Sequence, residues 1–352
     1  MADILNRWTG GQLFAFSALD GKTDFQHGLV ARTAVKGVAL EVKIPCAMKV
    51  SFAAEPCQAS LTGDYFVINL PSGTVKGVLV DAYHLLIEGP HDSIAMEKCE
   101  RVRIAHRDGR VLIGVDAFFD ATLLNADIDA LMAKRAEWLK GVPRPIGLGE
   151  LESAALQKAL TTMKTQFCSP EGIIKHMWTT PDRWPHQHMW LWDSVFHAIG
   201  LRHLDTELAK TILKAVLDHQ EEDGFIPHMM SPGEKSSITQ PPVLALGAKL
   251  ICEVEEDLSW LGSVYESLKR YLAWNMANRD TDGNGLLEWF IEENVNCRSG
   301  ESGMDNSNRF DDAIQLDATD FNSFMALEFR IMEEFANKLG YRDDAMDFHR
   351  KW

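Results

Sequence analysis

The residues most capable of chemistry lie in one polar stretch, Glu301–Asp311. It holds three carboxylates and an arginine between two segments with helical periodicity, and loops on a helical scaffold often carry functional side chains. A general acid needs a carboxyl group whose pKa is raised by burial or by a second carboxylate. Asp305 fits that role, with Glu301 and Asp311 as neighbouring carboxylates and Arg309 as an anchor for the loop. From composition alone, the stretch also fits a solvated acidic loop.

A second polar stretch, residues 180–194, is rich in tryptophan. Trp190 and Trp192 follow Trp184 within nine residues. Indole rings offer an apolar face and one N–H donor, which suits the stacking of a sugar ring. Asp193 could bind ligand hydroxyl groups, or it could cap the helix that follows. The sequence leaves both roles open.

Two further residues are candidates for contact with the same ligand. Phe225, in the stretch Asp223–His228, is expected to pack beneath the site. Gln240 precedes Pro241 and Pro242, and this rigid setting suits a fixed ligand contact. Either signal alone is weak, but both stretches lie between helical segments.

Another polar stretch, Asp280–Glu288, partly matches a calcium-binding loop. Side-chain oxygens occur at alternate positions and a glycine stands at the sharp turn. The glutamate expected at the twelfth position is replaced by Ile291, and runs of Asp, Asn and Gly also form ordinary turns. The candidate ligands for a structural calcium ion are Asp280, Asp282, Asn284, Leu286 and Glu288. No other cofactor is expected.

Composition limits the classes of function. A net charge of −16 without a basic cluster argues against a nucleic-acid partner, and no apolar run is long enough for a membrane span. The first residues lack a secretory pattern, so we expect a cytoplasmic protein. The cysteines have no CxxC spacing and are expected to be reduced packing residues; they are Cys46, Cys57, Cys99, Cys168, Cys252 and Cys297.

The length of 352 residues and a change of periodicity predict two domains of different class. Residues 1–120 contain many short β-prone runs separated by turn pairs such as Asp108–Gly109, which is typical of a β-sandwich. The runs are Leu13–Phe16, Val38–Ile44, Tyr65–Leu70, Val75–Val80, His84–Ile87, Arg101–Ala105 and Val111–Val115. Residues 121–148 form a helical linker.

Residues 149–352 have the apolar spacing of six or seven helices, joined alternately by short links and long polar loops. That alternation is expected of paired helices wound into a toroid with its site on the long-loop face. Asp205 is expected to cap one helix, Gly340 to end another, and the last helix to continue to Trp352. Apolar stripes are predicted at Leu261, Val264, Tyr265, Leu268 and Leu272, and at Phe324, Leu327, Ile331 and Phe335.

Taken together, these stretches resemble the inverting glycoside hydrolases of the (α/α)6 toroid class. The resemblance is closest to family 63, the processing α-glucosidases and their bacterial relatives, with the family 37 trehalases more distant. It extends over about residues 150–340, and the last of its motifs is the most specific. The matching motifs are Trp190–Ser194, Asp223–Pro227, Gln240–Pro242, Asp280–Glu288 and Glu301–Ser307.

The resemblance implies roles for particular residues. Asp305 is the general acid, while Trp192, Asp193 and Gln240 line the subsite for the non-reducing sugar. The remaining candidate substrate contacts are Trp190, Phe225, Glu301 and Arg309. The Asp280–Glu288 loop resembles one that holds calcium in some relatives.

The resemblance also implies that the chain is incomplete. A toroid of this class has twelve helices, and this chain supplies about half of them. The general base of the family is a glutamate late in the second half, and no residue here maps onto it. An open half-toroid would expose an apolar seam through which the chain could associate.

The predicted function is hydrolysis of an α-glucoside with inversion, with a general base in sequence missing from this chain. A disaccharide, a glucosylated small acid and an oligosaccharide end are all compatible substrates. The alternative is a catalytically incomplete carbohydrate-binding fragment that keeps the tryptophan platform.

Overall fold

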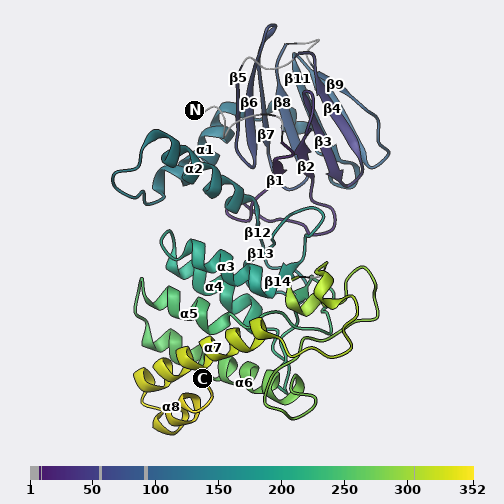
Figure 1. The fold of residues 1–352 in the computed structure, drawn as a ribbon. Helices are drawn as coiled ribbons and strands as arrows, with labels where there is room; N and C mark the ends of the chain where they lie inside the picture. Colours follow the sequence, from purple (N-terminus) through teal and green to yellow (C-terminus); the bar gives the residue numbers. More distant parts are fainter. Residues whose placement is uncertain (1–7, 9, 55–57, 91–93, 305) are drawn as a thin grey trace. The chain divides into compact units, whose positions relative to one another are not determined.

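The computed structural model describes residues 8, 10–54, 58–90, 94–304 and 306–352, which fall into two compact units (Figure 1). The first unit runs to Glu171 and includes Asp182–Gln187. The second unit, called the helical unit below, consists of Gly172–Pro181 and His188–Trp352.

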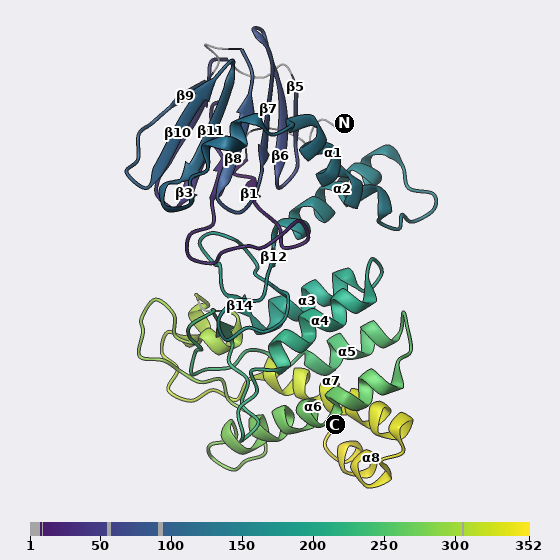
Figure 2. The same ribbon diagram turned by 180° about the vertical axis from the view of Figure 1, so that it is seen from behind.

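Two antiparallel sheets form most of the first unit (Figure 2). The strands of the first sheet, in spatial order, are β1 (Leu13–Ala15), β2 (Val30–Thr33), β3 (Ala39–Ile44), β4 (Met48–Phe52) and β9 (Ile94–Met96). Those of the second are β10 (Val102–Arg107), β11 (Arg110–Val115), β8 (His84–Glu88), β7 (Gly73–Leu79), β6 (Tyr65–Leu70) and β5 (Gln58–Leu61). One buried cluster takes side chains from both sheets, including Phe14 and Leu40 from the first and Phe66 and Val75 from the second. The two sheets therefore pack face to face.

Seven strands agree with the predicted β-prone runs, whereas β2, β4, β5 and β9 were not predicted; the seven are β1, β3, β6, β7, β8, β10 and β11. These four strands have only three to five residues, which is too short for a clear period of two. The predicted turn at Asp108–Gly109 joins β10 to β11, and both residues have positive φ (50° and 77°). That conformation suits a tight hairpin turn.

Two helices complete the first unit, α1 (Ile128–Gly141) and α2 (Glu150–Thr165), along with the 3-10 turns Asp116–Phe118 and Ala121–Asn125 and the short strand β12 (Phe167–Cys168). Buried charges hold α2 to the sheets. Lys164 Nζ lies 2.7 Å from carboxylate oxygens of both Asp20 and Asp64. These ion pairs explain why α2 belongs to the first unit, although the sequence placed the boundary before residue 149.

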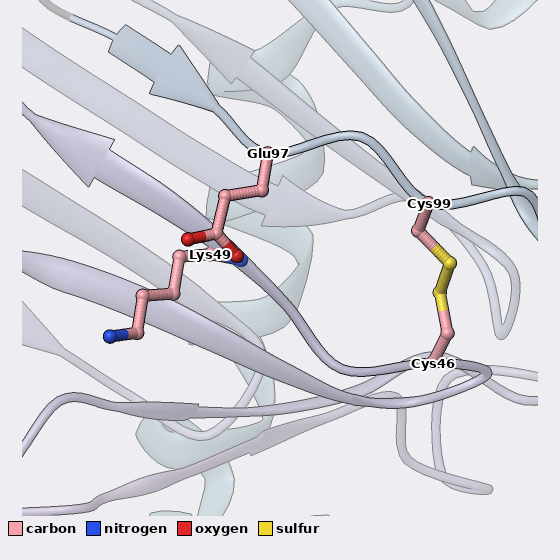
Figure 3. The surroundings of a disulfide bond; sticks show 4 residues. All are labelled: Cys46, Lys49, Glu97 and Cys99. Carbon is pink, nitrogen blue, oxygen red and sulfur yellow. A yellow bond between two sulfur atoms is a disulfide. The ribbon is translucent and has the colours of Figure 1, made fainter.

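A disulfide joins Cys46 and Cys99, and this pair corrects the expectation that all six cysteines are reduced (Figure 3). Their Cα atoms are 6.8 Å apart. The bond lies beside the pairing of β4 with β9, where the Lys49 amide donates to the Glu97 carboxylate at 3.0 Å. Disulfides persist mainly in oxidising compartments, and the cytoplasmic location stays a prediction.

The described residues of the helical unit form six α-helices: α3 (Leu191–Leu201), α4 (Thr206–Leu217), α5 (Leu244–Cys252), α6 (Leu258–Asn278), α7 (Thr319–Leu339) and α8 (Arg342–His349). They are arranged as three hairpins, α3–α4, α5–α6 and α7–α8. The first helices of the hairpins are neighbours, with α5 packed against both α3 and α7. Three short strands also occur: β13 (Trp178–Thr179), and the antiparallel pair β14 (Met189–Trp190) and β15 (Met229–Met230). No described helix is both long and apolar enough to span a bilayer.

The helix boundaries follow local capping chemistry. The Asp205 carboxylate accepts the Leu208 amide at 2.9 Å, as predicted for the start of α4. Gly340 ends α7 in the left-handed conformation, also as predicted. The predicted apolar stripe of α7 is partly wrong, because Phe324 and Leu327 are only half-buried. The last helix, expected to continue to Trp352, ends at His349.

The links of the helical unit are divided between its two ends (Figure 1). Residues 218–243 and 279–318 form the long links, and they gather at the end of the helices where β14 enters α3. The short links 202–205, 253–257 and 340–341 lie at the opposite end. All the candidate functional stretches in this unit are therefore carried at one end.

A buried carboxylate connects α7 to the start of α5. Glu328 accepts the amides of Ala245 at 2.7 Å and Leu246 at 2.8 Å, which are among the amides that a helix N-terminus leaves unpaired. Burial raises the pKa of Glu328 to about 8, although the two amide bonds act to lower it.

This contact predicts a pH dependence of stability. The folded-state pKa of Glu328 (about 8) lies above its ordinary value of 4.5, so the folded chain binds the proton more tightly between these pH values. The free energy of unfolding of the helical unit should therefore fall as pH rises from about 4.5 to 8, by at most about 1.4 kcal/mol per pH unit from this group. Urea unfolding at pH 5 and pH 8 measures the change. Glu328→Gln should flatten it, and an equal pH dependence in both proteins would refute the assignment.

Candidate functional site

The tryptophan-rich stretch leads from β14 into the first turn of α3. Trp190 closes β14 opposite Met229, and its ring lies perpendicular to that of His228, with centroids 5.1 Å apart. Trp192 and Asp193 occupy the first helical turn, where a negative side chain complements the helix dipole. The N-cap is Trp190, so the capping role considered for Asp193 is wrong.

Gln240 is connected directly to the tryptophan platform. Its side chain is buried, and Oε1 accepts the backbone N–H of Trp192 at 3.0 Å. Its backbone carbonyl accepts the Tyr271 hydroxyl at 2.9 Å, and that hydroxyl also lies 2.7 Å from Thr239 Oγ1. The structure therefore brings together two predicted sugar-binding residues that are 48 positions apart.

Glu301 is a buried residue of the candidate site. Its carboxylate is fully buried and accepts four hydrogen bonds. Two come from Arg279, through Nε at 2.9 Å and Nη2 at 2.5 Å, and one each from the amides of Thr239 and Phe290, both at 3.1 Å. The Glu301 side chain is therefore closed off from solvent in this structure, and its contact with substrate stays a prediction.

Gly303 places the same segment against the platform. This residue follows the short turn Gly300–Ser302 and has φ of 66°, in the left-handed region that favours glycine. A Cβ at this position would lie 2.4 Å from Cζ2 of Trp192. The backbone of Gly303 therefore rests on the indole ring of Trp192, and only glycine permits this approach.

Asp305, the predicted general acid, lies outside the described residues. On its N-terminal side, the Met304 amide donates to Ser302 Oγ at 3.0 Å. On its C-terminal side, the short turn Asn308–Phe310 carries Arg309, whose guanidinium lies 2.6 Å from the Asp320 carboxylate at the start of α7. This ion pair agrees with the anchoring role of Arg309, and its contact with substrate stays a prediction.

Arg279 is a functional candidate that the sequence did not reveal. It follows the last residue of α6, and its guanidinium carbon lies 4.7 Å from the Trp274 ring centroid and 5.7 Å from that of Phe290. Phe225 packs against Trp274 with centroids 4.9 Å apart. Phe225 therefore supports the surroundings of the Arg279–Glu301 pair, and its direct contact with a ligand remains a prediction. The only sequence signal was a cation placed just before a polar loop.

The Asp280–Glu288 loop gathers oxygen atoms, as a calcium site requires. Carboxylate oxygens of Asp282, Glu288 and Asp317 lie within 4.8 Å of one another. Asp280 Oδ1 is buried without a hydrogen-bond partner among the described residues, while Oδ2 accepts the Gly285 amide at 3.1 Å. Asp317 was not among the predicted ligands, because it is distant in sequence and joins the loop through a β-bridge with Glu288.

The buried Glu288 carboxylate is kept in its charged form. Burial raises its pKa, but hydrogen bonds from the Thr281 amide and the Gln315 side chain outweigh that effect, and the pKa is lowered overall. An anionic Glu288 beside Asp282 and Asp317 suits a hard divalent cation. The residues present therefore fit calcium, with Asp280 as a further oxygen donor.

The helical part of the chain is similar to proteins that are named as glycoside hydrolases. Residues 186–350 match the family model described as the mannosylglycerate hydrolase MGH1-like glycoside hydrolase domain. A mannosylglycerate hydrolase of Selaginella moellendorffii is 27% identical over 160 residues, which cover 39% of this chain and 31% of the relative. A glucosylglycerate hydrolase of Mycolicibacterium hassiacum is 31% identical over 164 residues, which cover 36% of this chain and 35% of the relative.

Among solved structures, a GH63 mannosylglycerate hydrolase from Thermus thermophilus in complex with glucose is 21% identical. The match covers 52% of this chain and 58% of that chain, with a TM-score of 0.43. The chain spans about a third of the length of the curated relatives it matches.

Proposed function

We propose that the chain belongs with the family 63 glycoside hydrolases and carries part of the active site of a hydrolase that cleaves a glycoside of glycerate. The observation that supports this most is the meeting of the predicted sugar-binding loops: Gln240 bonds to Trp192, and Gly303 packs against the same tryptophan. The relatives act, by their names, on mannosylglycerate and glucosylglycerate. A glucosylated small acid is among the substrates compatible with the sequence.

The proposed reaction is hydrolysis with inversion at the anomeric carbon. Asp305 protonates the glycosidic oxygen as the bond to the anomeric carbon breaks. A water molecule attacks that carbon from the opposite face, and a general base accepts its proton. The base is assigned to no residue of this chain. Trp192 and Asp193 are proposed to hold the sugar, with the indole ring against its apolar face.

The finer proposal for the fold is a β-sandwich followed by part of an (α/α)6 toroid. Two sheets that share one core support the first element. Three helical hairpins with neighbouring first helices, and with all long links at one end, support the second. Association through an exposed apolar seam also remains a proposal.

Hydrolysis is tested with the protein expressed from its complete reading frame. The substrates are α-glucosylglycerate and α-mannosylglycerate, and proton NMR follows the anomer of the hexose that forms first. Inversion predicts the β-anomer before mutarotation. Initial release of the α-anomer would refute the inverting mechanism, and no release from either glycoside would refute the proposed activity.

A carbohydrate-binding fragment is the second candidate. It is favoured because the chain carries the tryptophan platform while no general base is assigned within it. This function predicts saturable binding of the glycoside by the 352-residue chain without release of hexose. Hexose release by the chain alone would exclude it.

We also propose that calcium binds to Asp282, Glu288 and Asp317, with Asp280 as a further donor. The ion would fix the link between α6 and α7, on which Glu301 also lies. A ligand that binds only the folded state at 100 times its Kd adds about 2.7 kcal/mol to the free energy of unfolding.

Calcium should therefore raise the melting temperature of the EDTA-treated chain. Differential scanning calorimetry with and without millimolar calcium measures the shift. Asp282→Asn and Asp317→Asn should each reduce it, because each removes one anionic ligand, whereas Asp312→Asn serves as a control from the same link. An identical melting temperature with and without calcium would exclude the site.

A further inference from the structure

Glu301 closes a ring of contacts that includes the sugar platform. Its Oε1 accepts the amide of Thr239, and the next residue, Gln240, accepts the amide of Trp192. The indole of Trp192 lies against Gly303, which is two residues from Glu301 along the chain. These contacts therefore form a closed ring that begins and ends in the segment of Glu301 and Gly303 and passes through the segments of Gln240 and Trp192.

Glu301 is also held in place by Arg279, which is not part of this ring of contacts. The guanidinium of Arg279 binds both oxygens of Glu301 and lies close to the faces of Trp274 and Phe290. The indole N–H of Trp274 donates in turn to the Asp223 carboxylate at 3.1 Å. Glu301 therefore cannot shift without breaking a paired charge that is mostly buried, which proteins tolerate poorly.

The chemistry of Glu301 excludes a direct part in hydrolysis. Its carboxylate is fully buried, and protein donors occupy both of its oxygens. A general acid or base must reach the reacting atoms within hydrogen-bond distance. Any effect of Glu301 on the ligand must therefore be transmitted through the residues it holds.

We propose that Glu301, fixed by Arg279, is the positioning residue of the sugar site: it sets where Gln240 and Gly303 meet Trp192, and thereby the orientation of the indole platform. This inference rests on the proposed function, because it assumes that Trp192 binds a sugar. The geometry that it assigns to Trp192 can nevertheless be measured without any ligand.

The test replaces Glu301 by glutamine, which keeps the shape but loses the charge and one acceptor atom. The first readout is the affinity of the 352-residue chain for α-glucosylglycerate and α-mannosylglycerate by calorimetry. We expect Kd to rise at least about 10-fold, because displacements of about 1 Å have large effects in such sites. Glu293→Gln, an exposed glutamate of the same link, is the matched control and should leave Kd unchanged.

The second readout needs no ligand. The Trp192 amide does not touch Glu301, so its hydrogen exchange should quicken in Glu301→Gln only if Glu301 holds Gln240 in place. The emission of Trp192, taken as the difference from the same protein with Trp192→Phe, should shift as well. A merely structural role would lower the melting temperature without selectively altering these two signals.

A second variant changes the contact between Gly303 and Trp192 without altering Glu301. Gly303→Ala introduces a methyl group 2.4 Å from the indole and should displace Trp192 while leaving the Glu301 carboxylate in place. It keeps the proposal falsifiable if Glu301→Gln does not fold. Unchanged exchange and emission of Trp192 in both variants would overturn the positioning role. Absence of glycoside binding by the unmodified chain would instead refute the proposed function.

Discussion

Asp305→Asn is expected to lower kcat for hydrolysis of a glycerate glycoside by about 10²- to 10⁴-fold, with little change in Kd. The amide cannot donate a proton to the leaving oxygen, and general acid catalysis contributes roughly that factor. Glycerate is a poor leaving group, so its departure depends on protonation. The measurement is steady-state kinetics of the protein expressed from its complete reading frame, together with calorimetric binding of the same glycoside.

An activated substrate and a control variant test whether the loss of activity comes from the loss of proton donation. A glycoside with a dinitrophenol leaving group needs no protonation, and its hydrolysis should fall much less in Asp305→Asn. Asp312→Asn, an exposed carboxylate seven residues away, should behave as the unmodified protein. If Asp305→Asn hydrolyses the glycerate glycoside at the normal rate, the general acid has been assigned to the wrong residue.

Trp192→Ala should remove most of the affinity for the glycoside. The substitution deletes the indole platform and the surface on which Gly303 rests. Tryptophans at the centre of binding sites commonly contribute about 2–4 kcal/mol, which corresponds to roughly 30- to 1,000-fold in Kd. Calorimetric titration gives Kd directly, and circular dichroism checks that the helices remain.

The control for Trp192→Ala is Trp352→Ala. Trp352 is half-exposed and contacts Glu333 and His349 near the end of the chain, away from the long links. Its removal should leave Kd unchanged. Equal loss of affinity in both variants would mean that the effect is on folding and not on the platform.

The sequence predicted those parts of the structure that depend on local signals. The N-cap at Asp205, the left-handed Gly340 and the apolar stripe of α6 follow from neighbouring residues, and each is present. The alternation of short and long links between the helices could also be predicted from the sequence. It led to the prediction that the candidate loops lie at one end of the helices. Strands β2, β4, β5 and β9 were missed because runs of three to five residues carry only a weak periodicity.

Contacts between distant residues could not be predicted in the same way. Glu301 was recognised as a carboxylate near the predicted acid, but its burial depends on Arg279 and Thr239, which are 22 and 62 positions away. Spacing alone gave no sign of the Cys46–Cys99 disulfide, whose cysteines are 53 positions apart. Asp317 joins the candidate calcium site only because the chain returns beside Glu288.

The most direct test of the proposed sugar site is calorimetric titration of the unmodified 352-residue chain with α-glucosylglycerate and α-mannosylglycerate, with D-glycerate and sucrose as controls. We expect saturable binding of at least one glycerate glycoside, because the loops that carry Trp192, Gln240 and Gly303 already meet in this chain. Absence of saturable binding of either glycoside at millimolar concentration would show that these loops do not form a sugar site.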